Sequence, residues 1–310
     1  MIEFVSKPTP LVELLKEKSK RQEKIRPRKL KFRGALGFDL YNPSHEFNFD
    51  GDCYIAVRVE KRDSEISGVR IFKKSPDNVY DITDFSFQLL QDPFVTKIEG
   101  EIVFGGTAIE IDGKRKIVNW HTDFYKGPSL KELKFFLKAP DKMKDVRLHE
   151  HEGIHVFTRP QGGTAGPGKI GYFKANSLKE VTSEKIADAA VLDSHFASGE
   201  WGGVNQVLTL DNGLLGIVGH IAKMTGNGTR NYYGMVFCFD PFTKSSSKIK
   251  IISERSDFPP GPSKRSDLYN VIFPGGIIRQ KKGFATLYAG LSDAQIASAI
   301  IPDPFKEYEE

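Results

Sequence analysis

Residues 151–155 read HEGIH and match H-E-x-x-H, the pattern with which zinc metalloproteases hold a metal ion and a catalytic base. That chemistry requires a helix, where two histidines four residues apart reach one Zn²⁺ while the glutamate activates its water. Here a glycine stands inside the motif, and the alternating run IHVFTRP that follows predicts a strand. On a strand, residues four apart lie roughly 13 Å from each other. We therefore predict a hairpin turn at HEGIH, and no metal shared by His149, His151 and His155.

A second motif with possible chemistry follows directly. Residues 163–170, GTAGPGKI, fit the P-loop pattern G-x-x-x-x-G-K, but Ile170 stands where a P-loop needs Ser or Thr to hold Mg²⁺. The motif also leads into the strand-like run IGYFKA, so no helix N-terminus would face a phosphate. We predict a flexible glycine-rich loop, which could still contact a ligand at the edge of a site.

The composition predicts a soluble, globular chain. Its 310 residues are 39% hydrophobic, which is enough to bury a sizeable core in one or two domains. No run of 18 apolar residues occurs, and the N-terminus MIEFVSKPTPLVELL lacks the order of a signal peptide. We therefore expect a cytoplasmic protein without membrane contact. Cys53 and Cys238 stand in alternating apolar runs, which is typical of reduced core thiols.

The charge is modest and unevenly spread. Of a formal net charge of +5, much of the excess lies in KEKSKRQEKIRPRKLKFR, residues 16–33. This basic run has no interleaved aromatic residues for base stacking, so we predict a solvated helix or arm and no nucleic-acid partner.

The elements that must position any site are nearly all strands. Three leucines at helical spacing after Thr9-Pro10 predict one amphipathic helix over residues 10–24. Short β-branched or aromatic runs, separated by Gly, Pro, Asn and Asp, predict an all-β fold for the rest. The runs are CYIAVRV, GVRIF, EIVFGGTAIEI, IHVFTRP, KIGYFKA, QVLTL, LLGIVGHIA, YYGMVFCF, KIKII, NVIF, GFATLYAG and QIASAII.

A recurring turn suggests how these strands are grouped. A residue pair ending in glycine precedes a strand-like run five times, at intervals of roughly 50 to 70 residues. The pairs are Asp50-Gly51, Glu99-Gly100, Glu152-Gly153, Asn212-Gly213 and Lys282-Gly283. Five recurrences predict a five-bladed β-propeller over residues 34–310, preceded by a basic helical arm over residues 1–33. Since no WD or kelch signature occurs, a pair of β-sandwiches is the alternative.

Several segments, taken in order, resemble glycoside hydrolase family 130, the β-mannoside phosphorylases, and more closely glycosyltransferase family 108, the β-1,2-mannosyltransferases and phosphorylases. Both are families of five-bladed propellers. The segments are YNPS (41–44), YIAVRVE (54–60), QDPFVTKIEG (91–100), MKDVRLHE (143–150), FTRP (157–160), GGVNQVLTLDNGLLGIVGH (202–220), YYGMVFCFD (232–240), YNVIFPGG (269–276) and LYAGLSDAQIASAI (287–300).

The resemblance implies a catalytic role for Asp92. Asp92-Pro93 corresponds to the family's Glu-Asp-Pro-Arg motif, whose aspartate is the general acid. In an inverting phosphorolysis, phosphate attacks the anomeric carbon while a proton reaches the leaving oxygen on the other face, so one protein carboxyl is enough. The resemblance implies that this proton passes through the sugar's own 3-hydroxyl. Without the surrounding segments, an Asp-Pro pair is more typical of a capped turn.

Further residues are assigned to the substrate by the same resemblance. It implies mannose binding by Arg58 and Asp293, since guanidinium and carboxylate groups each make paired hydrogen bonds. The alternatives without a role in binding are a surface ion pair for Arg58 and a turn position for Asp293. Toward the leaving group or phosphate it places Asn42, Ser44, Lys144, Asp145, Arg159 and His220, and with less support Gln206 and Tyr232.

Two departures from the family-130 pattern narrow the function. Glu-Asp-Pro-Arg reads Gln91-Asp92-Pro93-Phe94 here, and His-Arg-Pro reads Thr158-Arg159-Pro160. Both changes affect the phosphate or acceptor side and favour the family-108 type. The resemblance thus implies an enzyme that transfers mannose, with inversion and without a cofactor or metal, between mannose 1-phosphate or GDP-mannose and β-1,2-mannooligosaccharides.

Two other functions stay open on the same scaffold. An inverting β-mannoside hydrolase would need a second carboxylate roughly 6.5 to 9.5 Å from the acid to activate water. A non-catalytic carbohydrate-binding propeller would need no acid.

Overall fold

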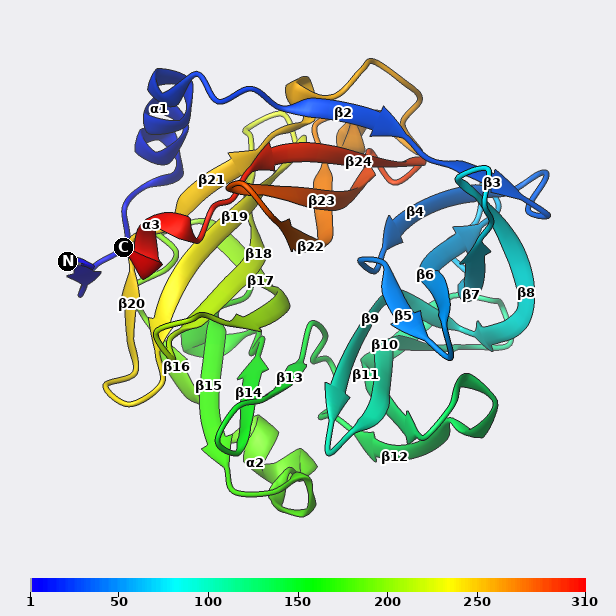
Figure 1. The fold of residues 1–310 in the computed structure, drawn as a ribbon, viewed down its shortest axis with the longest axis horizontal. Helices are drawn as coiled ribbons and strands as arrows, with labels where there is room; N and C mark the ends of the chain where they lie inside the picture. Colours follow the sequence, from blue (N-terminus) through cyan, green and yellow to red (C-terminus); the bar gives the residue numbers. More distant parts are fainter. Residues whose placement is uncertain (1) are drawn as a thin grey trace.

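Five small sheets surround a central axis in the computed structural model, which describes residues 2–310 (Figure 1). This arrangement confirms the predicted five-bladed β-propeller with a short N-terminal helix, and it excludes a pair of sandwiches. Within each blade, most consecutive strands are antiparallel neighbours; the exceptions are β4 and β5, which both pair with β6, and β20 and β21, which both pair with β19. The first strand of each blade lies nearest the axis.

The blades follow one another along the chain. Blade 1 contains β4 (Asp39–Pro43), β5 (Phe47–Phe49), β6 (Asp52–Glu60), β7 (Ser67–Lys74) and β8 (Val79–Gln88). Blade 2 contains β9 (Leu90–Ile98), β10 (Glu101–Ile111), β11 (Ile117–Gly127) and β12 (Lys134–Lys138), and blade 3 contains β13 (Arg147–Glu150), β14 (Ile154–Thr158), β15 (Ile170–Ala175) and β16 (Ala190–Leu192). Blade 4 contains β17 (Glu200–Thr209), β18 (Leu215–Met224), β19 (Arg230–Asp240), β20 (Ser245–Ser247) and β21 (Lys250–Ser253), and blade 5 contains β22 (Ile272–Gln280), β23 (Phe284–Leu291) and β24 (Gln295–Pro302).

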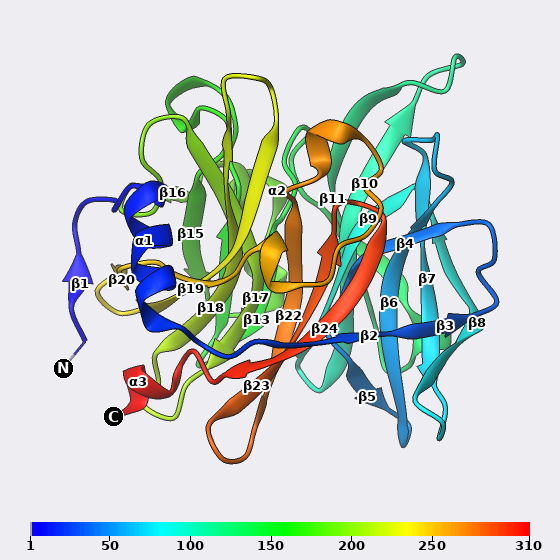
Figure 2. The same ribbon diagram turned by 90° about the horizontal axis from the view of Figure 1, so that it is seen from above.

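The N-terminal segment runs along the outside of the ring and joins three blades. β1 (Phe4–Val5) pairs with β20 of blade 4, β2 (Arg26–Lys29) with β24 of blade 5, and β3 (Lys31–Arg33) with β8 of blade 1 (Figures 1 and 2). The predicted helix over 10–24 is α1 (Leu11–Arg21), which buries Leu11 and Leu14 in a core cluster shared by blades 3 and 4. Two short helices, α2 (Ser183–Ala187) and α3 (Lys306–Glu309), complete the set. Within residues 2–310, no helix is long and apolar enough to span a bilayer.

The five glycine-containing pairs all lie in a turn at the same place in their blade. Each connects the strand nearest the axis, or β5 in blade 1, to the next strand of its blade. Every glycine has a positive φ, and so does the residue before it in four of the five pairs. The turn contains two residues in blades 1 and 2, three in blades 3 and 5, and five in blade 4. Short hairpin turns need residues with positive φ to match the twist of the strands, which explains why glycine recurs there. In Figure 2 the turns β5–β6 and β22–β23 lie at the same lower rim.

Both motifs that could have carried other chemistry consist of a loop that leads into a strand, as predicted. Residues 151–153 of HEGIH form the turn between β13 and β14, where the His151 amide donates to the Gly153 carbonyl, and Ile154 and His155 begin β14. Both ring nitrogens of His155 make hydrogen bonds of 2.8 Å, Nδ1 with the Tyr172 hydroxyl and Nε2 with the His151 carbonyl. Neither nitrogen is therefore free to bind a metal ion. The P-loop-like run contains one 3₁₀ turn at Gly163–Ala165 before β15 begins. Of the two free thiols, Cys238 is buried and Cys53 is half-buried.

Four of the five strands nearest the axis carry a β-bulge at a similar level. The register against the neighbouring strand shifts at Asn42 in β4, at Asp92-Pro93 in β9, at Asn205 in β17 and at Gly275 in β22. A bulge adds a residue to one strand and redirects a side chain. At three of the four bulges the redirected side chain is polar: Asn42, Asp92 and Asn205. Without the bulge, each would follow the regular alternation of side chains between the two faces of the strand.

Candidate active site

Residues from all five blades meet at the rim opposite the glycine turns. Each central strand starts at this rim, and each second strand returns to it, so the two ends of every hairpin open toward the same side (Figure 2). Four of the predicted site residues have left-handed backbones there: Asn42 (φ 44°), Asp92 (φ 49°), Asp145 (φ 59°) and Asp293 (φ 51°). Asparagine and aspartate tolerate this conformation best among residues with a side chain, and such backbones cluster at functional sites.

Asp92 is held by donors on one of its two oxygens. The carboxylate is buried, and its Oδ1 accepts hydrogen bonds from Asn42 Nδ2 at 2.8 Å and Arg58 Nη1 at 3.3 Å. Among residues 2–310, no protein donor is bonded to Oδ2. The arrangement fixes the carboxylate and leaves one oxygen for a ligand. Gly290 makes this possible, because a Cβ there would lie 2.1 Å from Asn42 Oδ1 and 2.4 Å from the Asn42 nitrogen.

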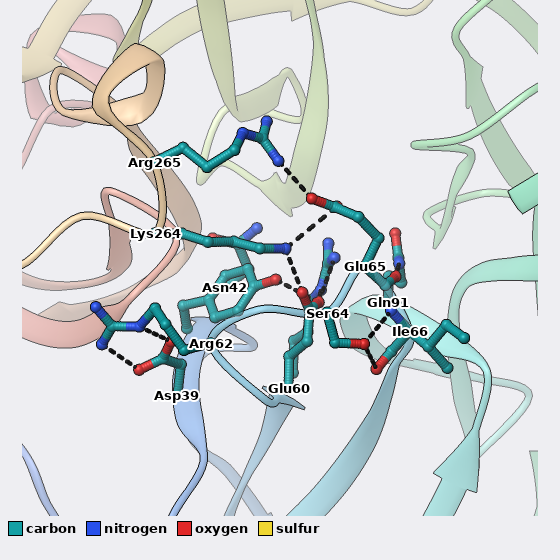
Figure 3. Close-up of polar contacts among 12 residues, drawn as sticks. Asp39, Asn42, Glu60, Arg62, Ser64, Glu65, Ile66, Gln91, Lys264 and Arg265 are labelled. Carbon is teal, nitrogen blue, oxygen red and sulfur yellow. Dashed lines mark hydrogen bonds and ion pairs between the residues drawn. The ribbon is translucent and has the colours of Figure 1, made fainter. Parts of the chain in front are cut away.

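A buried glutamate fixes the arginine of this cluster. Glu60 Oε2 accepts hydrogen bonds from Arg58 Nη2 at 2.8 Å and from the Tyr41 hydroxyl at 2.6 Å. Its other oxygen accepts from Lys264, which also lies 3.2 Å from Glu65 Oε2 (Figure 3). The guanidinium of Arg58 also lies over the Tyr41 ring, 4.8 Å from its centroid. Arg58 is therefore held in one orientation, with one nitrogen directed at Asp92.

Asp293 approaches the same cluster from the turn between β23 and β24. Burial, together with the nearby Asp92 carboxylate, raises the pKa of Asp293 to about 6, although the Arg58 cation acts in the opposite direction. A buried carboxyl beside another carboxylate favours its protonated form. Asp293 can thus hold a proton at a higher pH than an ordinary aspartate.

The second cluster lies at the open end of the β13–β14 hairpin. Arg147 pairs with Phe157 at the end of this hairpin, and Asp145 and Arg159 each lie two residues beyond that pair. Arg159 Nη1 lies 3.4 Å from Asp145 Oδ2, and both side chains are buried. Burial alone would raise the pKa of Asp145, but the nearby cations, Arg159 foremost, lower it. Asp145 is therefore an anion.

His220 completes this cluster as a neutral ring. Burial lowers its pKa to about 3. Its Nδ1 is 2.9 Å from Asn205 Oδ1, its Nε2 is 4.0 Å from Asp145 Oδ2, and its ring stacks on Tyr232 with centroids 5.6 Å apart. The Tyr232 hydroxyl accepts a hydrogen bond from Trp201 Nε1 at 3.1 Å.

The second cluster has an excess of positive charge. Lys144, Arg147 and Arg159 surround the single carboxylate of Asp145, and His220 is neutral. Among the described residues, Lys144 forms no ion pair within 4 Å, and Asn205 Nδ2 is buried without a hydrogen-bond acceptor. Within residues 2–310, Arg159 Nη1 makes no hydrogen bond either, and its nearest anion is the Asp145 carboxylate at 3.4 Å. Unsatisfied buried donors next to excess cations favour an oxyanion ligand such as phosphate.

Comparisons with known proteins decide the family. A protein-family model described as "Protein of unknown function (DUF1861)" matches residues 16–307. The chain belongs to the DUF1861 family. No curated protein sequence matches it significantly.

Solved structures place this DUF1861 chain near mannose-active enzymes. MPT-4, a mannose phosphorylase from Leishmania mexicana in complex with phosphate ion, is 34% identical, with a TM-score of 0.89 over 96% of this chain and 95% of that one. MPT-1, a GDP-Man-dependent mannosyltransferase from the same organism, is 30% identical, with a TM-score of 0.86 over 97% and 96%. A β-1,2-mannobiose phosphorylase from Listeria innocua shares the fold at 15% identity, with a TM-score of 0.64 over 92% and 98%. The predicted resemblance to families 108 and 130 is thereby confirmed.

Two predicted binding residues of the DUF1861 chain are occupied by protein contacts. The Ser44 hydroxyl donates to the His45 carbonyl at 2.7 Å and accepts from the Ala56 amide at 3.0 Å. The Gln206 amide donates to the Ile277 carbonyl at 3.1 Å and accepts from the Ile277 nitrogen at 2.7 Å, which joins blade 4 to blade 5. Both side chains fix the backbone near the site, and neither has a free group directed at the two clusters.

Five residues of the two clusters are absent from the sequence-based set: Tyr41, Glu60, Arg147, Asn205 and Lys264. Four stand inside the segments that carry the family resemblance, next to predicted residues, so proximity in sequence was an available signal. Arg147 is the most informative, because its guanidinium lies 4.3 Å from the centroid of the Phe94 ring. A cation from blade 3 thus covers the position where family 130 has the arginine of Glu-Asp-Pro-Arg.

A cavity next to the second cluster is lined in part by Arg147 and Asn205. It measures about 440 Å³ and is also lined by apolar side chains such as Phe47, Phe94 and Val207. Asp92 and Asp293 do not line it. We place the chemistry at the two polar clusters because that is where fixed carboxylates and unsatisfied donors converge.

Proposed function

We propose that this chain transfers mannosyl groups, with inversion, between mannose 1-phosphate and β-1,2-mannooligosaccharides, and that Asp92 is its general acid and base. The observation that supports this proposal most is the pairing of a carboxylate held on one oxygen by Asn42 and Arg58 with a cationic cluster on the neighbouring blades. An inverting phosphorolysis needs these two groups: an acid at the leaving oxygen and a cradle for the attacking phosphate.

The bonds change as follows. A phosphate oxygen attacks the anomeric carbon while the glycosidic C–O bond breaks on the opposite face. The leaving oxygen receives a proton from the sugar's 3-hydroxyl, which in turn receives one from Asp92. In the synthetic direction, Asp92 removes the proton and phosphate leaves. Arg58 and Asp293 would hold the mannose, since both lie next to Asp92.

Mannose 1-phosphate is favoured over GDP-mannose as the donor. The second cluster offers Lys144 without an ion-pair partner among the described residues, and a buried Arg159 nitrogen that makes no hydrogen bond beyond its 3.4 Å ion pair with Asp145. The 34% identical mannose phosphorylase was determined with a phosphate ion, whereas the mannosyltransferase at 30% identity is GDP-Man-dependent. The class of enzyme, one acting on mannosides, agrees with both.

The test incubates the purified chain with mannose 1-phosphate and β-1,2-mannobiose, and in parallel with GDP-mannose and the same acceptor. We expect trisaccharide and free phosphate from the first mixture. Asp92→Asn should lower kcat by about 10² to 10⁴, the usual contribution of general acid-base catalysis. Asp84→Asn, at an exposed position of β8, is the matched control and should leave kcat unchanged.

Each other outcome changes the proposal in a defined way. Product from GDP-mannose alone would overturn the donor, and free mannose without phosphate dependence would indicate a hydrolase. Full activity in Asp92→Asn would refute the role of this residue. Lys144→Met should raise the KM for phosphate about tenfold, as expected for loss of one charge-assisted contact, whereas Lys142→Met, two residues away and exposed, should not.

A further inference from the structure

Three potential metal ligands converge on blade 2, away from the site described above. The ligand atoms of Glu110, His121 and Asp141 all lie within 4.8 Å of one another. His121 Nδ1 is 3.6 Å from Glu110 Oε1 and 3.8 Å from Asp141 Oδ1. Two ligands bound about 2.1 Å from one tetrahedral ion lie about 3.4 Å apart, so small side-chain movements would complete a first shell.

The sheet itself brings these groups together. Glu110 of β10 pairs with Asn119 of β11, and His121 follows two residues later on the same face. Asp141 lies in the segment after β12, whose backbone bonds back to β11 through the Lys142 amide and the Trp120 carbonyl. His121 is 7% exposed, whereas both acids are exposed, so the imidazole forms the floor of an open site.

The buried histidine points at the acids with a free nitrogen. Among the described residues, Nδ1 of His121 has no hydrogen-bond partner. Its Nε2 lies 3.2 Å from Asp123 Oδ1, on the same face of β11, without forming a hydrogen bond with it. Metal-binding histidines commonly donate their other N–H to a carboxylate, so a small rotation of the Asp123 side chain would complete this supporting contact. This second observation distinguishes the cluster from an ordinary group of surface acids.

We propose that Glu110, His121 and Asp141 bind a divalent transition-metal ion such as Zn²⁺ or Mn²⁺, and that Asp123 orients the histidine. Two carboxylates and one imidazole suit these ions better than Mg²⁺ or Ca²⁺, which prefer oxygen ligands alone. The ion competes with Lys138, whose Nζ lies 2.9 Å from Asp141 Oδ1 and 3.4 Å from Glu110 Oε1. That side chain is 44% exposed, so it can move into solvent when a metal binds.

One short segment connects this site to the second, cationic cluster. Asp141 stands three residues before Lys144 and four before Asp145. Thr122, adjacent to His121, lies 3.4 Å from both the Met143 carbonyl and the Val146 amide. A metal at Asp141 would therefore restrict the segment that carries two residues of the cationic cluster. The binding itself does not depend on the proposed function.

The experiment titrates untagged, chelator-treated full-length protein with ZnCl₂ or MnCl₂ by calorimetry, with MgCl₂ for comparison. We expect one ion per chain, with Zn²⁺ bound more tightly than Mn²⁺ and Mg²⁺ weakest. At an ion concentration about 100 times Kd, the melting temperature should rise by ~4 °C. His121→Ala and Asp141→Asn should each weaken binding at least tenfold, Asp123→Asn should weaken it about tenfold, and Lys138→Met should strengthen it.

Two controls separate this site from other binding. Glu101→Gln changes a carboxylate that shares Lys126 with Glu99 on the same blade but has no histidine nearby, and it should leave the Kd unchanged. His151→Ala tests the HEGIH turn and should also have no effect. The proposal is overturned if binding is not saturable, if His151→Ala and not His121→Ala abolishes it, or if Lys138→Met weakens it. Asp141→Asn changes only an exposed side chain, so it keeps the test valid if His121→Ala does not fold.

Discussion

Glu60 is the residue for which the structure best allows the loss of stability on substitution to be predicted. Its carboxylate is 1% exposed and accepts hydrogen bonds from Tyr41, Arg58 and Lys264. Glu60→Gln keeps the shape but removes the charge between two cations. Arg58 would retain Asp92, and Lys264 would retain Glu65, so we place the cost near the lower end of the ~3–5 kcal/mol typical of a broken buried pair. For a chain of 310 residues, ~3 kcal/mol corresponds to a fall in melting temperature of ~5 °C.

Glu65→Gln is the matched control for Glu60→Gln. It removes the other carboxylate bonded to Lys264, but this one is 54% exposed (Figure 3). Exposed ion pairs contribute about 0–1 kcal/mol, so its melting temperature should fall by less than ~2 °C. Differential scanning calorimetry of both variants at pH 7 checks the difference. If Glu60→Gln falls no further than Glu65→Gln, the reasoning that burial makes this carboxylate essential is refuted. If the proposed function holds, Glu60→Gln should also raise the KM for the mannoside, because Arg58 loses its orientation.

Two further predictions concern Gly290 and Asp293. Gly290→Ala places a methyl group 2.4 Å from the Asn42 backbone nitrogen, which cannot move freely, so it should destabilise the fold by about 1–3 kcal/mol. Gly113→Ala is the control, because a methyl group there meets nothing within 4 Å, and it should change stability by less than ~0.5 kcal/mol. Urea unfolding of both variants measures the difference. The second prediction concerns Asp293, whose pKa is raised from 3.8 to about 6, so the folded state binds a proton more tightly than the unfolded chain does. The contribution of this proton to the free energy of unfolding is complete below pH 3.8 and is lost as the pH rises through 6. Asp293→Asn should have the same stability as the wild type near pH 4 and be more stable by up to ~2 kcal/mol at pH 7, a value already lowered because the side chain is partly exposed to solvent. If the stability of both proteins depends on pH in the same way, this prediction is wrong.

The blade number could be predicted because its signal is local. A short hairpin turn needs positive φ, glycine supplies it at little cost, and the sequence shows the glycine directly. The outer strands carry a weaker signal. β12 has the sequence KFFLK, with Phe135 55% exposed, and it does not appear among the strand-like runs because an edge strand lacks a buried face to impose alternation.

The bulges were harder to predict than the turns. Asp92-Pro93 considered alone is typical of a capped turn, yet it lies within β9, where the bulge accommodates a residue without an amide hydrogen. Proline also follows the bulged Asn42 in β4 and precedes the bulged Gly275 in β22. A proline inside a strand-like run was therefore the available signal for the residues that the bulges turn. The acid role of Asp92 stays a prediction.

The contact between Glu60 and Lys264 shows what sequence patterns could not supply. The two residues are 204 positions apart and meet only because blade 5 closes the ring against blade 1. β2 completes blade 5 and β3 extends blade 1, so the N-terminal segment holds together the two blades that contribute Asp293 and Arg58. Left-handed residues and bulges each cost free energy locally, and they persist only where the surroundings fix them. Closure of the ring therefore does more than stabilise the fold. It also holds the oppositely charged side chains of Arg58, Asp92 and Asp293, which come from three different blades, close enough to interact.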